Sequence, residues 1–337
     1  GTFGGHTIEF CDVFDTVRET GDHGSFNSWG RDRFWNLKDC PDEKLPELSK
    51  LDTEKTIIRN SRWRCDHGWD VDLDDGSSHY EIYNNLMLKG GLKLREGFYR
   101  HVYNNITVNN TLHPHVWYKY CGDRVHHNIW MGRYRPARIK FWDNDVDHNF
   151  FTKETDQKAF TSNGWDTHSA YGDPQFIDPA NGDYRVKDGS PALKAGFVNF
   201  PMDRFGVQKP ALKALARTPE LPHYQYRAAD PAADKQATRR VTVKWLGAVM
   251  TLLEGEEFSA FGINEEDGGL HIKRLGKGSP LEIATLQVDD VIQSINGDPV
   301  KDLASLNKAI SNLKKGQEVS IGYARLQKSQ KLIFKHP

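Results

Sequence analysis

The chain has few cysteines, almost no net charge and no long apolar segment. Its four cysteines are scattered, without a Cys-x-x-Cys pair, so we expect buried free thiols rather than a zinc site. Lys plus Arg (45) nearly balance Asp plus Glu (46), which leaves no electrostatic case for a nucleic acid partner. No apolar run reaches the roughly 18 residues that a membrane span needs. We therefore expect no metal or other cofactor, no nucleic acid and no membrane span.

The composition changes along the chain, which indicates two domains. With 337 residues the chain is longer than one core usually serves, and a mean hydropathy of −0.69 suits a repeat that exposes its outer face. Residues 198–240 are rich in proline and charge, which predicts a connector. We expect one domain over residues 1–197 and a second over residues 241–337.

A short motif recurs in the first domain: an apolar residue, two polar residues, a small polar residue and another apolar residue. It occurs at Ile82–Leu86, Val102–Ile106, Val125–Ile129 and Val146–Phe150, with looser copies at Ile58–Arg62 and Ile8–Asp12. Its asparagines are 20, 23 and 21 residues apart, a period that suits one turn of a right-handed parallel β-helix. In such a solenoid they would stack as an internal amide ladder, formed by Asn85, Asn105, Asn128 and Asn149.

A second strand is expected in each coil. These strands are predicted at Gly24–Trp29, Asp70–Asp74, Gly91–Arg95, Trp117–Cys121 and Arg138–Trp142. Alternation directs one set of side chains inward, namely Val71, Leu73, Leu92, Leu94, Tyr118, Tyr120, Ile139 and Phe141. The outward column is then Asn27, Asp72, Lys93, Lys119 and Lys140. Because the first coil begins abruptly at Ile8, we also expect further coils upstream in the native protein.

Acidic, basic and aromatic residues concentrate on this outward face, which we expect to form a solvent-facing groove. A neighbouring carboxylate raises the pKa of a carboxyl group, whereas a neighbouring Lys or Arg lowers it. One site can therefore hold a proton donor beside an ionised base. Strand residues two apart are about 6.5–7 Å from each other, near the gap of about 6.5–9.5 Å in inverting glycosidases. The predicted catalytic residues are Asp70, Asp72, Asp74, Lys93, Arg95 and His115. The predicted substrate-binding residues are His23, His67, Trp69, Trp117, Lys119, Arg138, Lys140 and Trp142.

Two further features bear on this face. An irregular insertion at 31–55, with Arg33, Phe34 and Trp35, is expected to overhang the groove. The structural alternative is an acidic solvated face, balanced by the Lys and Arg residues of the next coil.

The segment Asp173–Ala192 resembles the closing coil of secreted bacterial β-helix proteins that act on polysaccharides. The resemblance implies a secreted, periplasmic or cell-surface glycoside hydrolase. Carboxylates followed one coil later by Lys and Arg also look like calcium-dependent polysaccharide lyases. That resemblance would make Asp72 and Asp74 the Ca²⁺ ligands, Lys93 the base and Arg95 its partner. The third hypothesis is a non-catalytic scaffold that binds carbohydrate and peptide.

The second domain carries an ordered series of motifs: Trp245–Leu253, Ser259–Ile263, Gly269–Leu275, Gly278–Pro280, Val288–Ile292, Ile295–Val300 and a helix over Leu303–Leu313. In type, order and length these resemble bacterial PDZ domains, small α+β modules that bind the C-terminus of a peptide or protein. The resemblance implies a carboxylate-binding loop at Phe261, Gly262 and Ile263, followed by the strand to which the peptide adds. Leu306 would line the pocket for the last side chain.

Overall fold

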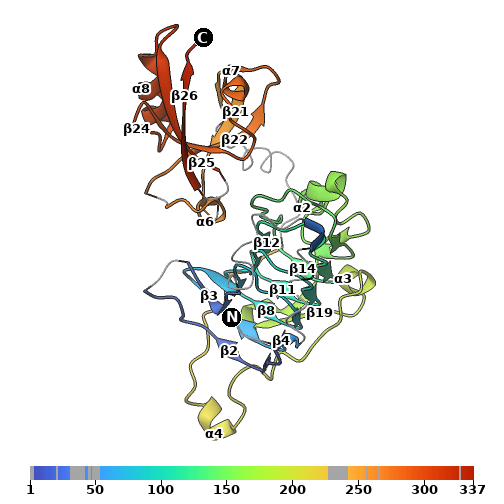
Figure 1. Ribbon diagram of the computed structural model, residues 1–337. Helices are drawn as coiled ribbons and strands as arrows, with labels where there is room; N and C mark the ends of the chain where they lie inside the picture. Colours follow the sequence, from blue (N-terminus) through green and yellow to red (C-terminus); the bar gives the residue numbers. More distant parts are fainter. Residues whose placement is uncertain are drawn as a thin grey trace. The chain divides into compact units, whose positions relative to one another are not determined.

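The computed structural model describes residues 4–19, 22–30, 42–44, 47, 54–226, 242–255, 257–264, 266–325 and 328–337. The chain forms two compact units, Gly1–Pro231 and Ala232–Pro337 (Figure 1). Both consist mainly of β-strands, as the sequence predicts. In the described part of the chain, no helix is long and apolar enough to cross a membrane.

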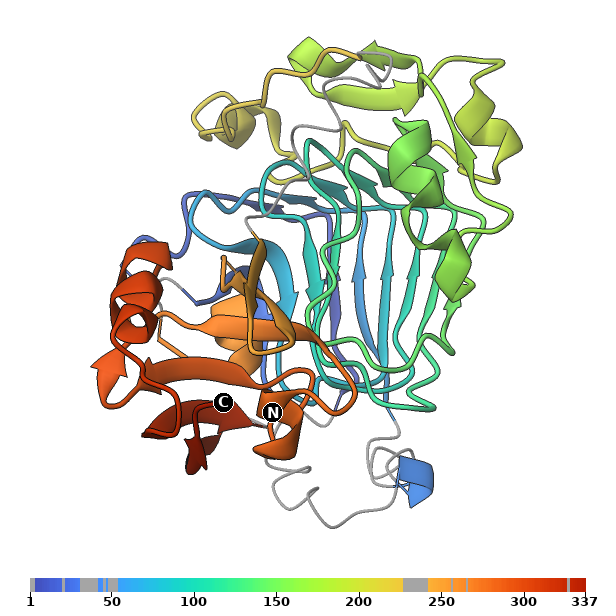
Figure 2. The same ribbon diagram turned by 90° about the horizontal axis from the view of Figure 1, so that it is seen from above.

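The first unit is a parallel β-solenoid with three sheets, which confirms the predicted fold class (Figure 2). The first sheet contains β1 (Thr7–Glu9), β4 (Thr56–Arg59), β7 (Tyr80–Tyr83), β10 (His101–Tyr103), β13 (Arg124–His126) and β15 (Asp145–Val146). The second contains β2 (Asp12–Val13), β5 (Arg62–Trp63), β8 (Leu86–Met87), β11 (Ile106–Thr107), β14 (Ile129–Trp130), β16 (Phe150–Phe151) and β17 (Ala170–Tyr171). The third contains β3 (Gly24–Ser28), β6 (Trp69–Leu73), β9 (Leu92–Leu94) and β12 (Leu112–Pro114).

The asparagine ladder is present at the bend between the first two sheets. Asn85 Nδ2 donates to Asn105 Oδ1 at 3.0 Å, Asn105 to Asn128 at 2.9 Å, and Asn128 to Asn149 at 3.0 Å. All four side chains are fully buried. Each amide also donates to backbone carbonyls of its own and the preceding coil, so the ladder satisfies polar groups that the bend would otherwise leave unpaired. In the preceding coil Ser61 occupies the ladder position, and its backbone amide donates to Asn85 Oδ1 at 3.3 Å.

The third sheet is shorter than predicted. β3, β6 and β9 lie within or near the expected ranges, and Val71, Leu73, Leu92 and Leu94 point into the core as expected. The strand of the next coil is β12, however, and not Trp117–Cys121; Arg138–Trp142 forms no strand either. Val116, Tyr120 and Arg138 have positive φ angles of 51°, 61° and 53°, which an extended strand cannot accommodate. Tyr120, predicted to point inward, is consequently 47% exposed.

Short helices and a hairpin also belong to the first unit. They comprise η3 (Asp42–Lys44), α2 (Glu154–Gln157), η4 (Lys158–Asn163), β18 (Phe176–Asp178), η5 (Pro179–Asn181), β19 (Asp183–Val186), α3 (Pro191–Lys194) and α4 (Pro210–Lys213). Phe176 and Tyr184 of the antiparallel β18–β19 hairpin pack with Ile106, Ile129 and Phe150 of the second sheet. That sheet is therefore buried on both faces, which explains why its outward residues are apolar.

Part of the predicted connector packs with the first unit, and the three described cysteines are free thiols. Phe200 and Phe205 lie inside the expected connector range but are buried in the same cluster as the hairpin. Cys11, Cys65 and Cys121 form no disulfide, as expected, while Cys40 lies outside the described residues.

The second unit is one sheet with helices, in the strand order β20-β21-β22-β23-β25-β26, with β24 beside β23. The strands are β20 (Thr242–Trp245), β21 (Ala248–Leu252), β22 (Leu270–Leu275), β23 (Val291–Ile295), β24 (Asp298–Pro299), β25 (Glu318–Arg325) and β26 (Lys328–Lys335). The helices are α6 (Glu257–Phe261), α7 (Pro280–Ile283) and α8 (Leu303–Ser311). A capping box of Asp302 and Ser305 starts α8, whose Leu306 and Ala309 join the core beneath the sheet.

Candidate functional site

A buried ion network lies on the outer face of the third sheet. Strand register places Asn27, Asp72 and Lys93 side by side on β3, β6 and β9. Lys93 Nζ lies 3.2 Å from Asp72 Oδ1 and 3.2 Å from Asp74 Oδ1. Asn27 Nδ2 donates to Asp72 Oδ2 at 3.0 Å. The structure thus brings together three of the predicted catalytic residues, and each has a partner of opposite charge.

The two carboxylates of this network differ in acidity. Burial raises the pKa of Asp72 to about 7, although the neighbouring Lys93 charge opposes that rise. Burial alone would also raise the pKa of Asp74, but the charges of Lys93 and Arg95 outweigh it, and the pKa of Asp74 lies below its ordinary value. A protonated carboxylic acid and an ionised carboxylate can therefore coexist two residues apart near neutral pH.

Asp70 does not belong to this face, which corrects the prediction. The amides of Asp70 and Val71 both donate to the Gly91 carbonyl, at 3.1 and 3.2 Å, so the alternation of β6 is interrupted there. The Asp70 carboxylate accepts hydrogen bonds from the amides of Cys65 (2.6 Å), Lys89 (3.0 Å) and Gly91 (3.1 Å). It therefore ties together the turns that precede β6 and β9, a structural role.

The remaining predicted catalytic residues lie at the edges of the network. Arg95 Nε is 2.5 Å from Asp75 Oδ1 and 3.8 Å from Asp74 Oδ1. His115 meets the Trp69 ring edge-on, with centroids 6.3 Å apart. The register partner of Lys93 on β12 is His113, which the analysis of the sequence missed. The alternating pair His113 and His115 was the available signal, because residues two apart share a face.

Most of the predicted catalytic residues are buried, whereas they were expected to face a solvent-filled groove. Asp72, Lys93 and His115 are 0% exposed and Arg95 is 4% exposed, while the Asp74 side chain retains 21%. The Trp69 ring lies over the Lys93 ammonium, with its centroid 3.9 Å from Nζ. Protein atoms therefore occupy the space beside Lys93 that a sugar was expected to fill.

Trp117 and Trp142 do not display their rings on this face as expected. Trp117 is 2% exposed, donates from Nε1 to the Leu94 carbonyl at 2.8 Å and packs against Trp165. Trp142 stacks on Phe160. These tryptophans join the core because the strands predicted to display them do not form. Lys119, Arg138, Lys140, His23 and His67 lie outside the strands, and Arg33, Phe34 and Trp35 lie outside the described residues.

An aromatic strip that the sequence analysis missed lies on the outer face of the first sheet. Tyr83 and Tyr103 are register partners and stack with centroids 4.7 Å apart and planes 8° from parallel. Arg59 Nη1 donates to the Tyr83 hydroxyl at 2.7 Å, and the Tyr103 hydroxyl donates to Glu81 at 3.2 Å. The repeats at Ile82–Leu86 and Val102–Ile106 contained the signal, since a tyrosine occupies the same position in both.

The second unit corrects the expected peptide site. β22, the strand after Gly262, pairs with β21 on one side and, at Leu270 and His271, with β23 on the other, so its first residues have no open edge. Phe261 and Ile263 are buried against Leu253 and Val291, and Leu306 is buried in the main core. The side chains of Phe261, Ile263 and Leu306 therefore support the fold, and of the assigned residues Gly262 alone is exposed.

A cavity of about 530 Å³ lies at the turn between β20 and β21. Its lining comprises Lys244, Trp245, Leu246, Gly247, Ala248, Val249, Arg274, Leu275 and Gly276. Leu246 and Gly247 form a two-residue turn with φ angles of 44° and 85°, the left-handed geometry typical of tight hairpins. Lys244, Val249 and Arg274 are register neighbours on three adjacent strands and so face the same side.

Comparison with known proteins identifies the second unit. Residues 246–335 match the family model of the PDZ domain. A probable periplasmic serine endoprotease DegP-like from Pseudomonas savastanoi pv. phaseolicola is 36% identical over 105 residues, covering 31% of this chain and 22% of the relative. The protein of the same description from Rhizobium meliloti is 30% identical over 86 residues, covering 26% and 17%. The chain thus spans about a fifth of the length of these relatives.

A solved structure gives a weaker likeness. The HtrA-type protease AlgW with decapeptide is 24% identical, with a TM-score of 0.24, covering 28% of this chain and 29% of the other. The matches to relatives fall in the C-terminal region and do not extend over the solenoid. The C-terminal unit of this chain is a PDZ domain.

Proposed function

We propose that the PDZ domain binds the C-terminal segment of a peptide or protein at the β20–β21 turn. The observation that carries this proposal is the cavity beside the turn, with Lys244 and Arg274 flanking the apolar Val249. A C-terminal residue presents a carboxylate and a side chain together, which suits a lining of cations around an apolar surface. Among the described residues β20 is the end strand of the sheet, the place at which we expect a peptide strand to add.

Titration calorimetry with free and C-terminally amidated peptides from a library selection tests this proposal. Arg274→Glu should weaken binding of the free peptide about tenfold or more, because it places a like charge beside the carboxylate. Lys308→Glu on α8 makes the same charge change outside the cavity and should leave the affinity unchanged. Equal affinity for free and amidated peptides would contradict carboxylate recognition.

The proposed location of the protein is the periplasm. The DegP-like relatives are described as periplasmic, and they match this chain in its PDZ region. Their endoprotease activity is not part of the proposal, because the match does not extend to the solenoid. Fractionation of cells that express the native gene, followed by immunoblotting, should recover the protein with periplasmic markers, and recovery with cytoplasmic markers would contradict this location.

A second candidate function places polysaccharide hydrolysis on the solenoid. The observation in its favour is the pair Asp72 and Asp74, whose pKa values are shifted in opposite directions, as an acid and a base require. A lyase is less favoured, because two carboxylates hold the Lys93 ammonium that would have to reach a substrate proton. In a binding scaffold, the ion network would serve only to stabilise the third sheet.

A polysaccharide panel separates these three hypotheses. New reducing ends without unsaturated uronates indicate a hydrolase, calcium-dependent unsaturated products indicate a lyase, and binding without turnover indicates a scaffold. Asp72→Asn should abolish turnover by a hydrolase, while Asp188→Asn, at an exposed position, should not. Unchanged turnover of a proven substrate by Asp72→Asn would exclude the third-sheet site.

A further inference from the structure

Histidines replace asparagines in the outer row of the solenoid bend. In each coil a residue with left-handed backbone precedes the internal ladder, with φ of 48° at Asn60, 54° at Asn84, 56° at Asn104, 57° at His127 and 55° at His148. The asparagines bond between coils, from Asn84 to Asn60 at 3.1 Å and from Asn104 to Asn84 at 2.7 Å. The last coils therefore present imidazoles where the first present amides.

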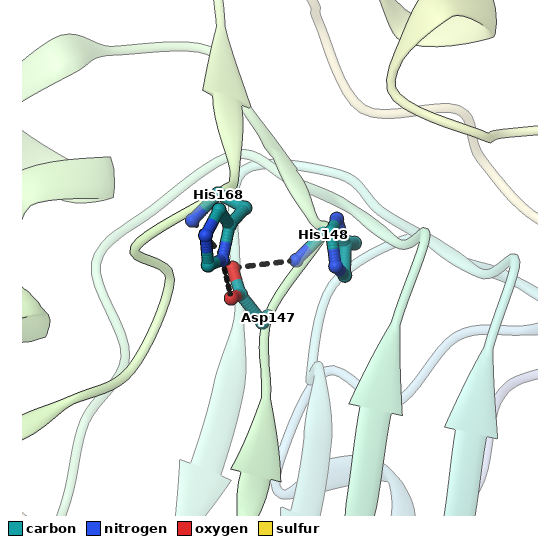
Figure 3. A group of neighbouring side chains, drawn as sticks. All are labelled: Asp147, His148 and His168. Atoms are coloured by element: carbon teal, nitrogen blue, oxygen red, sulfur yellow. Dashed lines mark hydrogen bonds and ion pairs between the residues drawn. The ribbon is translucent and has the colours of Figure 1, made fainter.

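His148 of this row and His168 of the next coil lie beside the carboxylate of Asp147, as Figure 3 shows. His148 stacks on His168, with centroids 5.4 Å apart and planes 19° from parallel. Asp147 Oδ2 is 2.6 Å from His168 Nδ1. One ligand atom from each of Asp147, His148 and His168 lies within 4.8 Å of the others.

We propose that Asp147, His148 and His168 form a binding site for a divalent transition-metal ion such as Zn²⁺. Two imidazole nitrogens and one carboxylate oxygen make a three-ligand set that Zn²⁺ accepts, with water in the remaining position. Ligand atoms on a tetrahedral Zn²⁺ are roughly 3.3 Å apart at bond lengths of about 2.0–2.1 Å. The ligand atoms here lie within 4.8 Å of one another, and small side-chain rotations would bring them to the shorter spacing. Such rotations are possible because both imidazoles are on the surface and the His168 side chain is 70% exposed.

The carboxylate is already fixed in position for this role. Asp147 Oδ1 accepts from the backbone amides of His148 and His168, each at 2.8 Å. The Thr167 hydroxyl donates to Asp147 Oδ2 at 3.2 Å. Hydrogen bonds that orient a ligand raise the affinity of a metal site. The ion would replace the contact between Asp147 and His168, so metal and proton compete and acidification should weaken binding.

The chain contains a matched control beside the proposed site, on strands β13 and β15. His126 Nε2 lies 3.0 Å from Asp145 Oδ2, so this pair also joins an imidazole to a carboxylate. The second neighbour of Asp145 is Arg124, at 3.5 Å, in place of another imidazole. A cation at that place repels a metal ion, and His126 should not bind one.

Calorimetric titration of the full chain with Zn²⁺ tests the proposal, and Co²⁺ absorption reports the coordination. One equivalent of Zn²⁺ should bind, and Co²⁺ should give a tetrahedral-type visible band. His148→Ala and His168→Ala should each weaken Zn²⁺ binding at least about tenfold, while His126→Ala should leave it unchanged. Circular dichroism should show all three variants folded, since these side chains are on or near the surface. Absence of saturable Zn²⁺ binding by the wild type would overturn the proposal, as would wild-type affinity for Zn²⁺ in His148→Ala or His168→Ala.

Discussion

Replacing Asn128 by alanine should destabilise the solenoid more than any exposed substitution of the same type. Its amide donates to the carbonyls of Val102 (3.1 Å) and His126 (2.9 Å) and to Asn149 Oδ1 (3.0 Å). Its Oδ1 accepts from the Asn105 backbone amide at 3.0 Å and from Asn105 Nδ2 at 2.9 Å. Alanine leaves the buried Asn105 backbone amide without its acceptor, whereas Asn105 Nδ2 keeps the carbonyls of Ile82 and Tyr103. At about 1–3 kcal/mol for an unsatisfied buried group, the expected loss of unfolding free energy is about 1–3 kcal/mol.

Urea unfolding followed by tryptophan fluorescence measures this loss. Most tryptophans lie in the solenoid, whereas the PDZ domain has Trp245, so the solenoid transition dominates the signal. Asn163→Ala, at an exposed position of η4, is the matched control and should change the free energy of unfolding by less than about 0.5 kcal/mol. If Asn128→Ala cost no more than this control, the ladder would not be a source of stability and the reasoning would fail.

Other perturbations test the interior of the solenoid and the PDZ fold. Burial raises the pKa of Asp166 from 3.8 to about 7, so this group should lower stability progressively as the pH rises between those values. Asp166→Asn should flatten that dependence in unfolding experiments at several pH values, and an unchanged slope would contradict the assignment. Arg100→Met should cost about 3–5 kcal/mol, because it leaves the fully buried Asp123 charge without its partner, 2.5 Å away. Replacing both Arg100 and Asp123 by apolar residues should lower the free energy of unfolding less than Arg100→Met alone. A larger loss in the double variant, measured by denaturant titration, would contradict this prediction. Gly269→Ala should melt the PDZ domain at lower temperature in calorimetry but leave the solenoid transition in place, because the added Cβ would lie 2.5 Å from Val291 Cγ1.

The sequence alone was sufficient for the features that depend on local repetition. The period of the asparagine motif predicted the solenoid and its internal ladder, because identical side chains in successive coils must stack when the coils do. The ordered motifs from Trp245 onward likewise identified the PDZ domain. Alternation on β6 and β9 correctly placed Asp72 beside Lys93, since the side-chain period of a strand is two.

The tertiary structure decided what surrounds those residues. Left-handed residues such as Val116 and Arg138 interrupt the strands expected in the later coils, and a turn of this kind does not show in an apolar-polar pattern. Burial of the charged face depends on how rings such as Trp69 pack over it, and strand pairing determines which edge of the PDZ sheet stays open. His148 and His168 are 20 positions apart in the chain and meet only because one coil stacks on the next. Sequence patterns determine which face a side chain takes, whereas its exposure and its neighbours depend on contacts between segments distant in the chain.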